Sequence, residues 1–168
     1  ERFYETPLPS EGIVFPQGWM SPRDLTVIYN AARQARGNVL EVGPWLGRST
    51  TAIALGLRDR TSVEAGPAMF DTIDYGIVSA EEWNERFGEN LAPAKAGGKA
   101  TAAVYHPGGP IAVLIDNLKW NGLLPHVTHT IRGDFLTCPI QRSYGMIFCD
   151  ATHDEAEITA NVPRLAEL

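Results

Sequence analysis

Short apolar runs alternate along the chain with segments whose apolar residues recur at helical spacing. Four of these runs are predicted strands: Val39–Val42, Met69–Asp74, Val127–Arg132 and Met146–Asp150. Strands that alternate with helices usually form a parallel sheet with helices on both of its faces. The chain is therefore predicted to have an α/β fold.

The predicted sheet is doubly wound, mostly parallel and Rossmann-like, a class that usually continues to five or more strands. We find four, and the last predicted helix runs to Leu168, so we expect that the C-terminal strands are lacking. The 168 residues, 44% of them hydrophobic, are enough for one domain with its own core. Residues 1–20 show no hydrophobic period and are expected to form an N-terminal arm on a domain of residues 21–168.

Capping signals mark the starts of several predicted helices. Ser21 is followed by a proline at the first helical position and then by an acid, and Ser79–Glu82 and Thr152–Glu155 repeat the capping pattern. Apolar residues at helical spacing over Ile111–Leu118 predict a further amphipathic helix. By contrast, Leu91–Pro110 is rich in Ala, Gly, Lys and Pro, and we expect a mobile loop there.

The turn EVGPWLGRST, from Glu41 to Thr50, connects the first predicted strand to a predicted helix. A phosphate-binding loop needs four residues between its glycines and a lysine after the second, whereas three residues separate Gly43 from Gly47 and an arginine follows. A dinucleotide-binding turn needs a middle glycine so that the backbone can approach the pyrophosphate, and bulky residues occupy that place. The sequence therefore fits a phosphate-binding loop and a dinucleotide-binding turn less well than it fits a turn for a third kind of ligand.

The turn suits a ligand that carries both an amine and a carboxylate. The Glu41 carboxylate and the carbonyl groups near Gly43 are expected to receive the amine. Gly47 then leads into the helix, where the N–H groups at Ser49 and Thr50 are expected to bind the carboxylate at the positive end of the helix dipole. S-adenosylmethionine has such an amino-acid group.

Four segments in this order carry a wider pattern: MSPRDLTVIYNAARQARGNVLEVGPWLGRST, FDTIDYG, IRGDF and MIFCDATHDEAEI. Together they resemble the class I S-adenosylmethionine-dependent methyltransferases, and within them the small-molecule O-methyltransferases of the catechol and macrolide types. The resemblance implies that Asp74 binds the ribose hydroxyls of the cofactor. It also implies that Asp134 accepts a hydrogen bond from the adenine amino group and that Phe135 flanks the adenine ring.

Transfer of a methyl group to a hydroxyl requires a group that takes the hydroxyl proton. Asp150 and His153 are the candidates, because both follow the last predicted strand, at the edge where ligands bind in open parallel sheets. The helix dipole is expected to keep His153 neutral and so able to act as a base. The resemblance also implies that Asp150 binds a divalent metal such as Mg²⁺, although the sequence does not supply the other ligands of such a site.

The formal net charge of −6 and a pI near 5.2 argue against binding of nucleic-acid phosphates and favour a small-molecule substrate. No apolar run approaches the length of a membrane span and no targeting segment is found, so we expect a cytoplasmic protein without membrane partners. Cys138 and Cys149 lack metal-site spacing and are expected to be core thiols. The composition and charge of the chain are compatible with a homo-oligomer.

The sequence leaves two other functions open. A module that binds S-adenosylmethionine without catalysis would explain the missing strands and the incomplete metal site. A nicotinamide-dependent oxidoreductase would use the same turn for a dinucleotide. Methyl transfer to a small-molecule acceptor, through a hydroxyl group, is the leading prediction.

Overall fold

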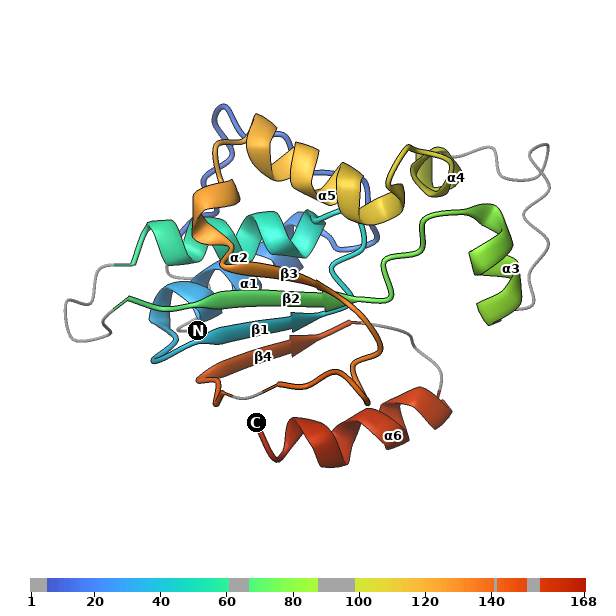
Figure 1. Ribbon diagram of the computed structural model, residues 1–168. Helices are drawn as coiled ribbons and strands as arrows, with labels where there is room; N and C mark the ends of the chain where they lie inside the picture. The colour runs from blue at the N-terminus through green and yellow to red at the C-terminus, as the bar shows by residue number, and fades with distance from the viewer. Residues whose placement is uncertain (1–5, 61–66, 88–98, 141, 151–154) are drawn as a thin grey trace.

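The computed structural model describes residues 6–60, 67–87, 99–140, 142–150 and 155–168. Its centre is a four-stranded sheet in which all strands are parallel and the order is β3-β2-β1-β4 (Figure 1). The strands are β1 (Val39–Val42), β2 (Phe70–Asp74), β3 (His129–Arg132) and β4 (Met146–Cys149). The predicted α/β fold with a parallel, Rossmann-like sheet is confirmed.

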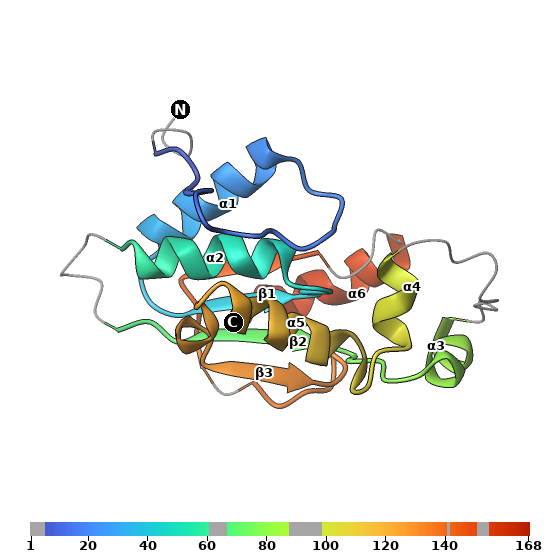
Figure 2. The ribbon, with the colours of Figure 1, turned by 90° about the horizontal axis from the view of Figure 1, so that it is seen from above.

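Helices cover both faces of this sheet (Figures 1 and 2). The helices on one face are α1 (Pro22–Gln34), α2 (Arg48–Arg58) and α5 (Gly109–Trp120), and the helix on the other is α6 (Glu155–Leu165). Beyond the carboxyl ends of the strands lie α3 (Ala80–Phe87) and α4 (Lys99–Val104), and a 3-10 turn, η3 (Leu124–His126), connects α5 to β3. Among the described helices, none has the length and apolarity needed to cross a lipid bilayer.

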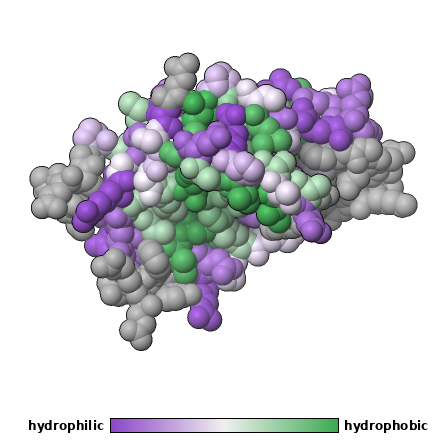
Figure 3. Space-filling view, turned by 90° about the horizontal axis from the view of Figure 1, so that it is seen from below, coloured by the Kyte–Doolittle hydropathy of each residue, from purple (hydrophilic) through white to green (hydrophobic). Residues whose placement is uncertain are grey.

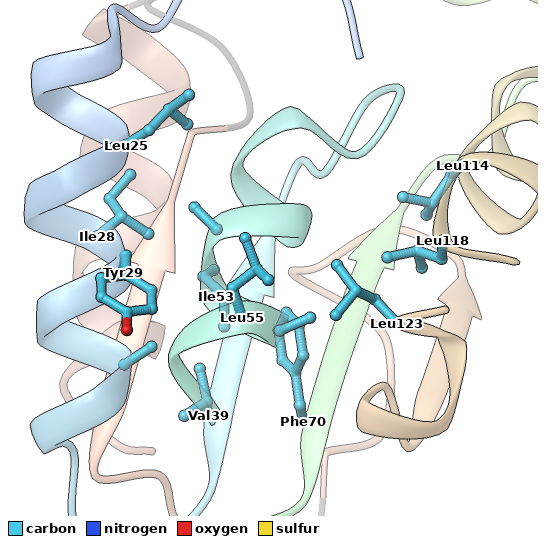
Figure 4. Close-up of a cluster of buried hydrophobic side chains, with 13 residues drawn as sticks. Leu25, Ile28, Tyr29, Val39, Ile53, Leu55, Phe70, Leu114, Leu118 and Leu123 are labelled. Carbon is cyan, nitrogen blue, oxygen red and sulfur yellow. The ribbon is translucent and has the colours of Figure 1, made fainter. Parts of the chain in front are cut away.

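Two hydrophobic clusters, one on each face of the sheet, hold these layers together. Because side chains alternate along a strand, Val39 and Phe70 belong to the cluster shared with α1, α2 and α5 (Figure 4). Leu40 and Ile73 point to the opposite face, where Leu165 of α6 packs against their cluster. The central strands therefore carry apolar side chains on both faces, as a parallel sheet covered by helices requires.

Two predicted helix starts are confirmed by their caps. At α1, Ser21 Oγ accepts a hydrogen bond from Asp24 N–H at 3.2 Å, and the Asp24 carboxylate accepts one from Ser21 N–H at 3.0 Å. At α3, Ser79 Oγ accepts from Glu82 N–H at 3.2 Å. There the Glu82 carboxylate accepts from Val78 N–H at 3.0 Å, one residue earlier than in the usual capping box.

Residues 6–20 form the predicted N-terminal arm and contain no helix or strand. Side chains of the domain hold the backbone of the arm. Asn30 of α1 donates a hydrogen bond to Thr6 O at 2.8 Å. Asn121, which follows α5, exchanges two hydrogen bonds of 2.8 and 2.9 Å with the backbone of Val14. The arm is thereby bound along the helices on one face of the sheet (Figure 2).

The prediction of a loop over Leu91–Pro110 is wrong for its second part. Residues 99–104 form α4, and α5 already begins at Gly109. Alanine is the strongest helix former, so the Ala-rich composition supports a helix here, and Ala103 and Val104 are buried. The first part of the predicted loop, before α4, lies outside the described residues.

The expectation that both cysteines are core thiols is also wrong. Cys149 is exposed, because it is the last residue of β4, an edge strand of the sheet. Cys138 is half-buried and packs at the margin of the cluster on the α6 face.

At the amino ends of the strands, Asp71 of β2 connects three segments of the chain. Its side chain is 2% exposed. Asp71 Oδ1 lies 2.7 Å from His129 Nδ1 of β3. Asp71 Oδ2 accepts a hydrogen bond from the Tyr144 hydroxyl at 2.8 Å and forms an ion pair with the Arg142 guanidinium, 3.1 Å away. Burial, together with the bond to Asp71, raises the pKa of Tyr144. This network joins β2, β3 and the segment before β4 at the end of the sheet opposite to the carboxyl ends of the strands.

Candidate functional site

The loops that follow the strands meet at one edge of the sheet. Three backbone hydrogen bonds join them: Gly43 N–H to Ile73 O (2.9 Å), Gly133 N–H to Asp74 O (2.8 Å) and Asp150 N–H to Val42 O (2.9 Å). Each bond extends the parallel pairing by one step beyond the regular strands. The predicted site residues that come from four distant segments are thereby held side by side.

Two adjoining cavities lie at this edge. The inner cavity, of about 270 Å³, is bounded by the ends of β1, β2 and β3 and by α6, and Asp134 and Phe135 contribute to its lining. The outer cavity, of about 560 Å³, lies between the glycine turn and the N-terminal arm, and Ser49 and Asp150 contribute to its lining. Four residues line both cavities: Gly43, Trp45, Asp74 and Trp83.

The glycine turn after β1 contains three residues with positive φ. Gly43, Trp45 and Gly47 have φ angles of +83°, +49° and +93°. A tryptophan rarely adopts this left-handed conformation, and such strain is concentrated at functional sites. A Cβ atom at Gly47 would lie 2.5 Å from Leu114 Cδ1 of α5, so a side chain there would force Leu114 to move. Asn117 of α5 also donates a hydrogen bond of 2.9 Å to a carbonyl of the turn.

Glu41 lies beneath this turn and is not among the residues that line the two cavities. Its side chain is fully buried, and its carboxylate accepts hydrogen bonds from Ser49 Oγ at 2.5 Å and from Thr50 Oγ1 at 2.6 Å. Burial raises the pKa of Glu41 to about 7; the two hydroxyls oppose this shift, and the carboxylates of Asp150 and Asp74 add to it. Glu41 thus positions the first turn of α2. The contact between Glu41 and the amine of a ligand stays a prediction.

Asp74 ends β2 and faces both cavities. Its carboxylate accepts a hydrogen bond from Gly76 N–H at 2.7 Å and another from Trp45 N–H. Burial raises the pKa of Asp74 against the effect of these two bonds. The acid predicted to bind ribose therefore connects the end of β2 to the glycine turn.

Asp134 and Phe135 follow β3 and line the inner cavity with Asp74. Asp134 Oδ1 accepts a hydrogen bond from the backbone N–H of Leu136 at 2.8 Å, which fixes the loop. Phe135 is 5% exposed, and the Arg164 guanidinium lies 5.3 Å from the centre of its ring. Asp74, Asp134 and Phe135, for which the resemblance implies contacts with the nucleoside of the cofactor, thus line one cavity.

Asp150 follows β4 and lines the outer cavity. His153, the other candidate base, lies outside the described residues. Within the ranges that the structure describes, no group of three or more His, Cys, Asp or Glu residues could hold a metal ion. Because Mg²⁺ requires several oxygen ligands, the Asp150 carboxylate alone does not make a magnesium site among these residues, and the predicted metal stays a prediction.

Two tryptophans separate the cavities. The rings of Trp45 and Trp83 meet edge to face, with their centroids 6.0 Å apart and an interplanar angle of 61°. Trp45 belongs to the glycine turn but is not among the residues that the sequence predicts for the site. Trp83 belongs to α3, and nothing in the sequence of a short capped helix indicates which of its side chains reaches a cavity.

The N-terminal arm closes one side of the outer cavity. Arg48, the first residue of α2, donates hydrogen bonds to the backbone carbonyls of Met20 at 2.9 Å and Pro16 at 2.8 Å. A Cβ atom at Gly18 would lie 2.8 Å from the Arg48 side chain, so the arm follows this guanidinium closely. Trp19, 88% exposed, contributes to the cavity wall. The arm is therefore attached to the helix end that forms the opposite wall.

Some predicted residues line the cavities and others support them. Those on the walls are Gly43, Ser49, Asp74, Asp134, Phe135 and Asp150. Glu41, Gly47 and Thr50 support the glycine turn from inside. The chain matches no family model, and no curated protein matches it at a significant level.

Proposed function

We propose that the protein is an S-adenosylmethionine-dependent methyltransferase that acts on a hydroxyl group of a small-molecule acceptor. The observation that carries this proposal is the position of Asp74, which faces both of two adjoining cavities at the carboxyl ends of parallel strands. Ligands of open parallel sheets bind at this edge. One cavity suits the nucleoside of the cofactor, and the other suits its amino-acid end together with an acceptor.

The chemistry of the inner cavity favours a nucleoside without phosphates. Asp74, Asp134 and Glu157 line it, and no lysine or arginine is among its described lining residues. Carboxylates accept hydrogen bonds from ribose hydroxyls and from an amino group, whereas they repel phosphate oxygens. Phe135 and aliphatic residues offer apolar contact to a flat base. These features support adenosine and argue against the pyrophosphate of a nicotinamide cofactor.

The outer cavity favours a cationic group. The carboxylates of Asp74 and Asp150 and the rings of Trp45 and Trp83 line it. Arg48, the one basic residue of the described lining, donates to the backbone carbonyls of Met20 and Pro16. Carboxylates and aromatic faces both attract cations, and the cofactor carries a sulfonium and an amine. At the same wall, Ser49 lies in the first turn of α2, where free N–H groups and the helix dipole favour a carboxylate.

When bound, the cofactor supplies a methyl group that is activated by the positive charge on sulfur. The residues of the outer cavity would then hold the acceptor in line for the transfer, which is the larger part of the catalytic work. Asp150 would take the hydroxyl proton as the acceptor oxygen bonds to the methyl carbon, while the bond from that carbon to sulfur would break and leave its electron pair on the sulfur of S-adenosylhomocysteine. Trp45 and Trp83 would exclude water from the space between donor and acceptor.

Isothermal titration calorimetry with S-adenosylhomocysteine, the demethylated product, tests the cofactor. We expect the protein to bind S-adenosylhomocysteine. We expect no binding of NADH, because its pyrophosphate would be repelled by the carboxylates of the inner cavity. Binding of NADH instead would favour the oxidoreductase. No binding of S-adenosylhomocysteine by the complete protein would reject the proposal.

A second measurement separates an enzyme from a binding module. Incubation with S-adenosylmethionine labelled in its methyl group and a panel of small phenols and alcohols should give labelled product. Cofactor binding without product from any acceptor would favour the non-catalytic module.

A further inference from the structure

Helix α6 turns an amide toward the sheet where an apolar side chain is expected. Asn161 is 5% exposed, and Leu165, one turn later, packs in the hydrophobic cluster beneath the helix. By contrast, Ile158 and Val162 of the same helix are 50% and 54% exposed, and hydrophobic side chains gather on this face of the molecule (Figure 3). A polar side chain buried at the expense of apolar neighbours calls for a physical reason.

The Asn161 side chain lines the inner cavity together with Asp134 and Phe135. In the part of the chain that the structure describes, its carboxamide has no hydrogen-bond partner. The polar atoms of Asn161 are not among the described side-chain atoms that are fully buried without a partner, so they are accessible from the cavity. Asparagine is in addition a weak helix former, so its place in α6 is not explained by helix propensity. A ligand in the cavity that supplies both a donor and an acceptor would pair both polar groups of the amide.

We propose that Asn161 binds the edge of adenine in the inner cavity. Its carboxamide oxygen accepts a hydrogen bond from the 6-amino group, and its NH₂ group donates one to the adjacent ring nitrogen. Asparagine binds adenine in this bidentate way because the base presents a donor beside an acceptor. The inference rests on the proposed function, since the adenine is that of the cofactor.

Asn161 and Asp134 divide the recognition of the base between them. The Asp134 carboxylate can only accept, so it can bind the second amino hydrogen but no ring nitrogen. Asn161 supplies a donor beside an acceptor in one planar group, which neither the carboxylates of Asp74 and Glu157 nor the donors of Tyr75 and the two tryptophans in this lining offer. Asn161 is therefore a residue that determines the specificity for adenine.

The contact is tested by calorimetry with two ligands, S-adenosylhomocysteine and its purine analogue, which lacks the 6-amino group. Asn161→Leu is expected to weaken the binding of S-adenosylhomocysteine about 10- to 100-fold, the usual value of a bidentate pair. It should weaken the binding of the purine analogue much less. The difference measures the coupling between the side chain and the amino group.

A stability measurement on the ligand-free protein separates this role from a purely structural one. Asn161→Leu is expected to raise the Tm, because leucine continues the apolar face of α6, whereas loss of a structural amide would lower it. Asn161→Ala serves as a second variant if leucine does not fit. Val162→Ala, on the exposed side of the helix, is the matched control and should leave both affinities unchanged.

The outcomes distinguish the two proposals. If the unaltered protein does not bind S-adenosylhomocysteine, the proposed function fails and the inference fails with it. If the protein binds S-adenosylhomocysteine but Asn161→Leu and Asn161→Ala leave its affinity unchanged, only the recognition of adenine by Asn161 is overturned. The same holds if the substitutions weaken the binding of S-adenosylhomocysteine and of the purine analogue equally.

Discussion

The carboxylate of Glu41 accepts a hydrogen bond of 2.5 Å from the hydroxyl of Ser49, so a strand residue is bonded to the helix that follows the glycine turn. The acid has no contact with solvent. Because burial raises its pKa from 4.5 to about 7, folding is coupled to proton uptake by this side chain.

The pH dependence of stability should reveal this coupling. Between pH 4.5 and about 7 the folded protein keeps a proton on Glu41 that the unfolded chain has released, so the free energy of unfolding falls as the pH rises. The contribution over this window is about 3 kcal/mol. Glu41→Gln, which has no proton to lose, should remove it and be the more stable form at pH 8. Urea unfolding at pH 4.5 and pH 8 measures this, and identical pH slopes for both proteins would contradict it.

A second prediction concerns the close approach of α5 to the glycine turn. Gly47→Ala should destabilise the protein in two ways: alanine is strained at a φ of +93°, by about 1–2 kcal/mol, and its Cβ would displace Leu114, at a further cost of about 1–3 kcal/mol. Gly122→Ala is the matched control, because Gly122 has a φ of +66° but no atom within 4 Å of a Cβ. Chemical unfolding compares the two, and equal losses would mean that the packing against Leu114 adds nothing.

A third prediction concerns the acid that faces both cavities. Asp74→Ala should weaken the binding of S-adenosylhomocysteine by about 1–3 kcal/mol, because the ribose hydroxyls lose a charged acceptor. Some stability should also be lost, since the N–H groups of Gly76 and Trp45 lose their acceptor. Calorimetry measures the affinity and circular dichroism checks the fold. Asp116→Ala, at an exposed position of α5, should change neither, and an unchanged affinity in Asp74→Ala would show that another acid binds the ribose.

The fourth prediction concerns the proton acceptor. Asp150→Ala should lower the rate of methyl transfer about 10²- to 10⁴-fold, the range that positioned proton transfer provides, and should leave the affinity for S-adenosylhomocysteine nearly unchanged. His153→Ala tests the other candidate that the sequence supplies. Full activity in His153→Ala with an inactive Asp150→Ala would assign the proton to Asp150 alone. Full activity in both variants would mean that transfer depends on positioning without a base.

Much of the fold could be predicted from the sequence, because strand and helix periods and capping residues are local signals. The bounds of β1 agree with the prediction at both ends, and the capping box at Ser21 is present as expected. The prediction for residues 99–104 is wrong because an alanine-rich composition is compatible with both a loop and a helix, and only the burial of Ala103 and Val104 distinguishes the two.

The candidate site could be predicted only where its residues follow strands directly. Asp74, Asp134 and Asp150 belong to this group, because parallel strands end at a common edge. Trp83 and Asn161 reach the cavities from helices, and their inward direction depends on how each helix is rotated against the sheet. For α6 the pattern of apolar residues does not indicate that rotation, because Ile158 and Val162 lie on the exposed side of the helix.

The buried carboxylate of Asp71, with His129, Tyr144 and Arg142, holds the strands together at the end of the sheet that is farthest from the cavities. The groups that maintain the strand register are thus different from the groups that meet a ligand. Substitutions in the arm or in α3 are expected to alter what the outer cavity binds without disturbing this network. Descendants of such a chain can therefore change their ligand by substitutions at one end of the sheet while selection for folding acts at the other.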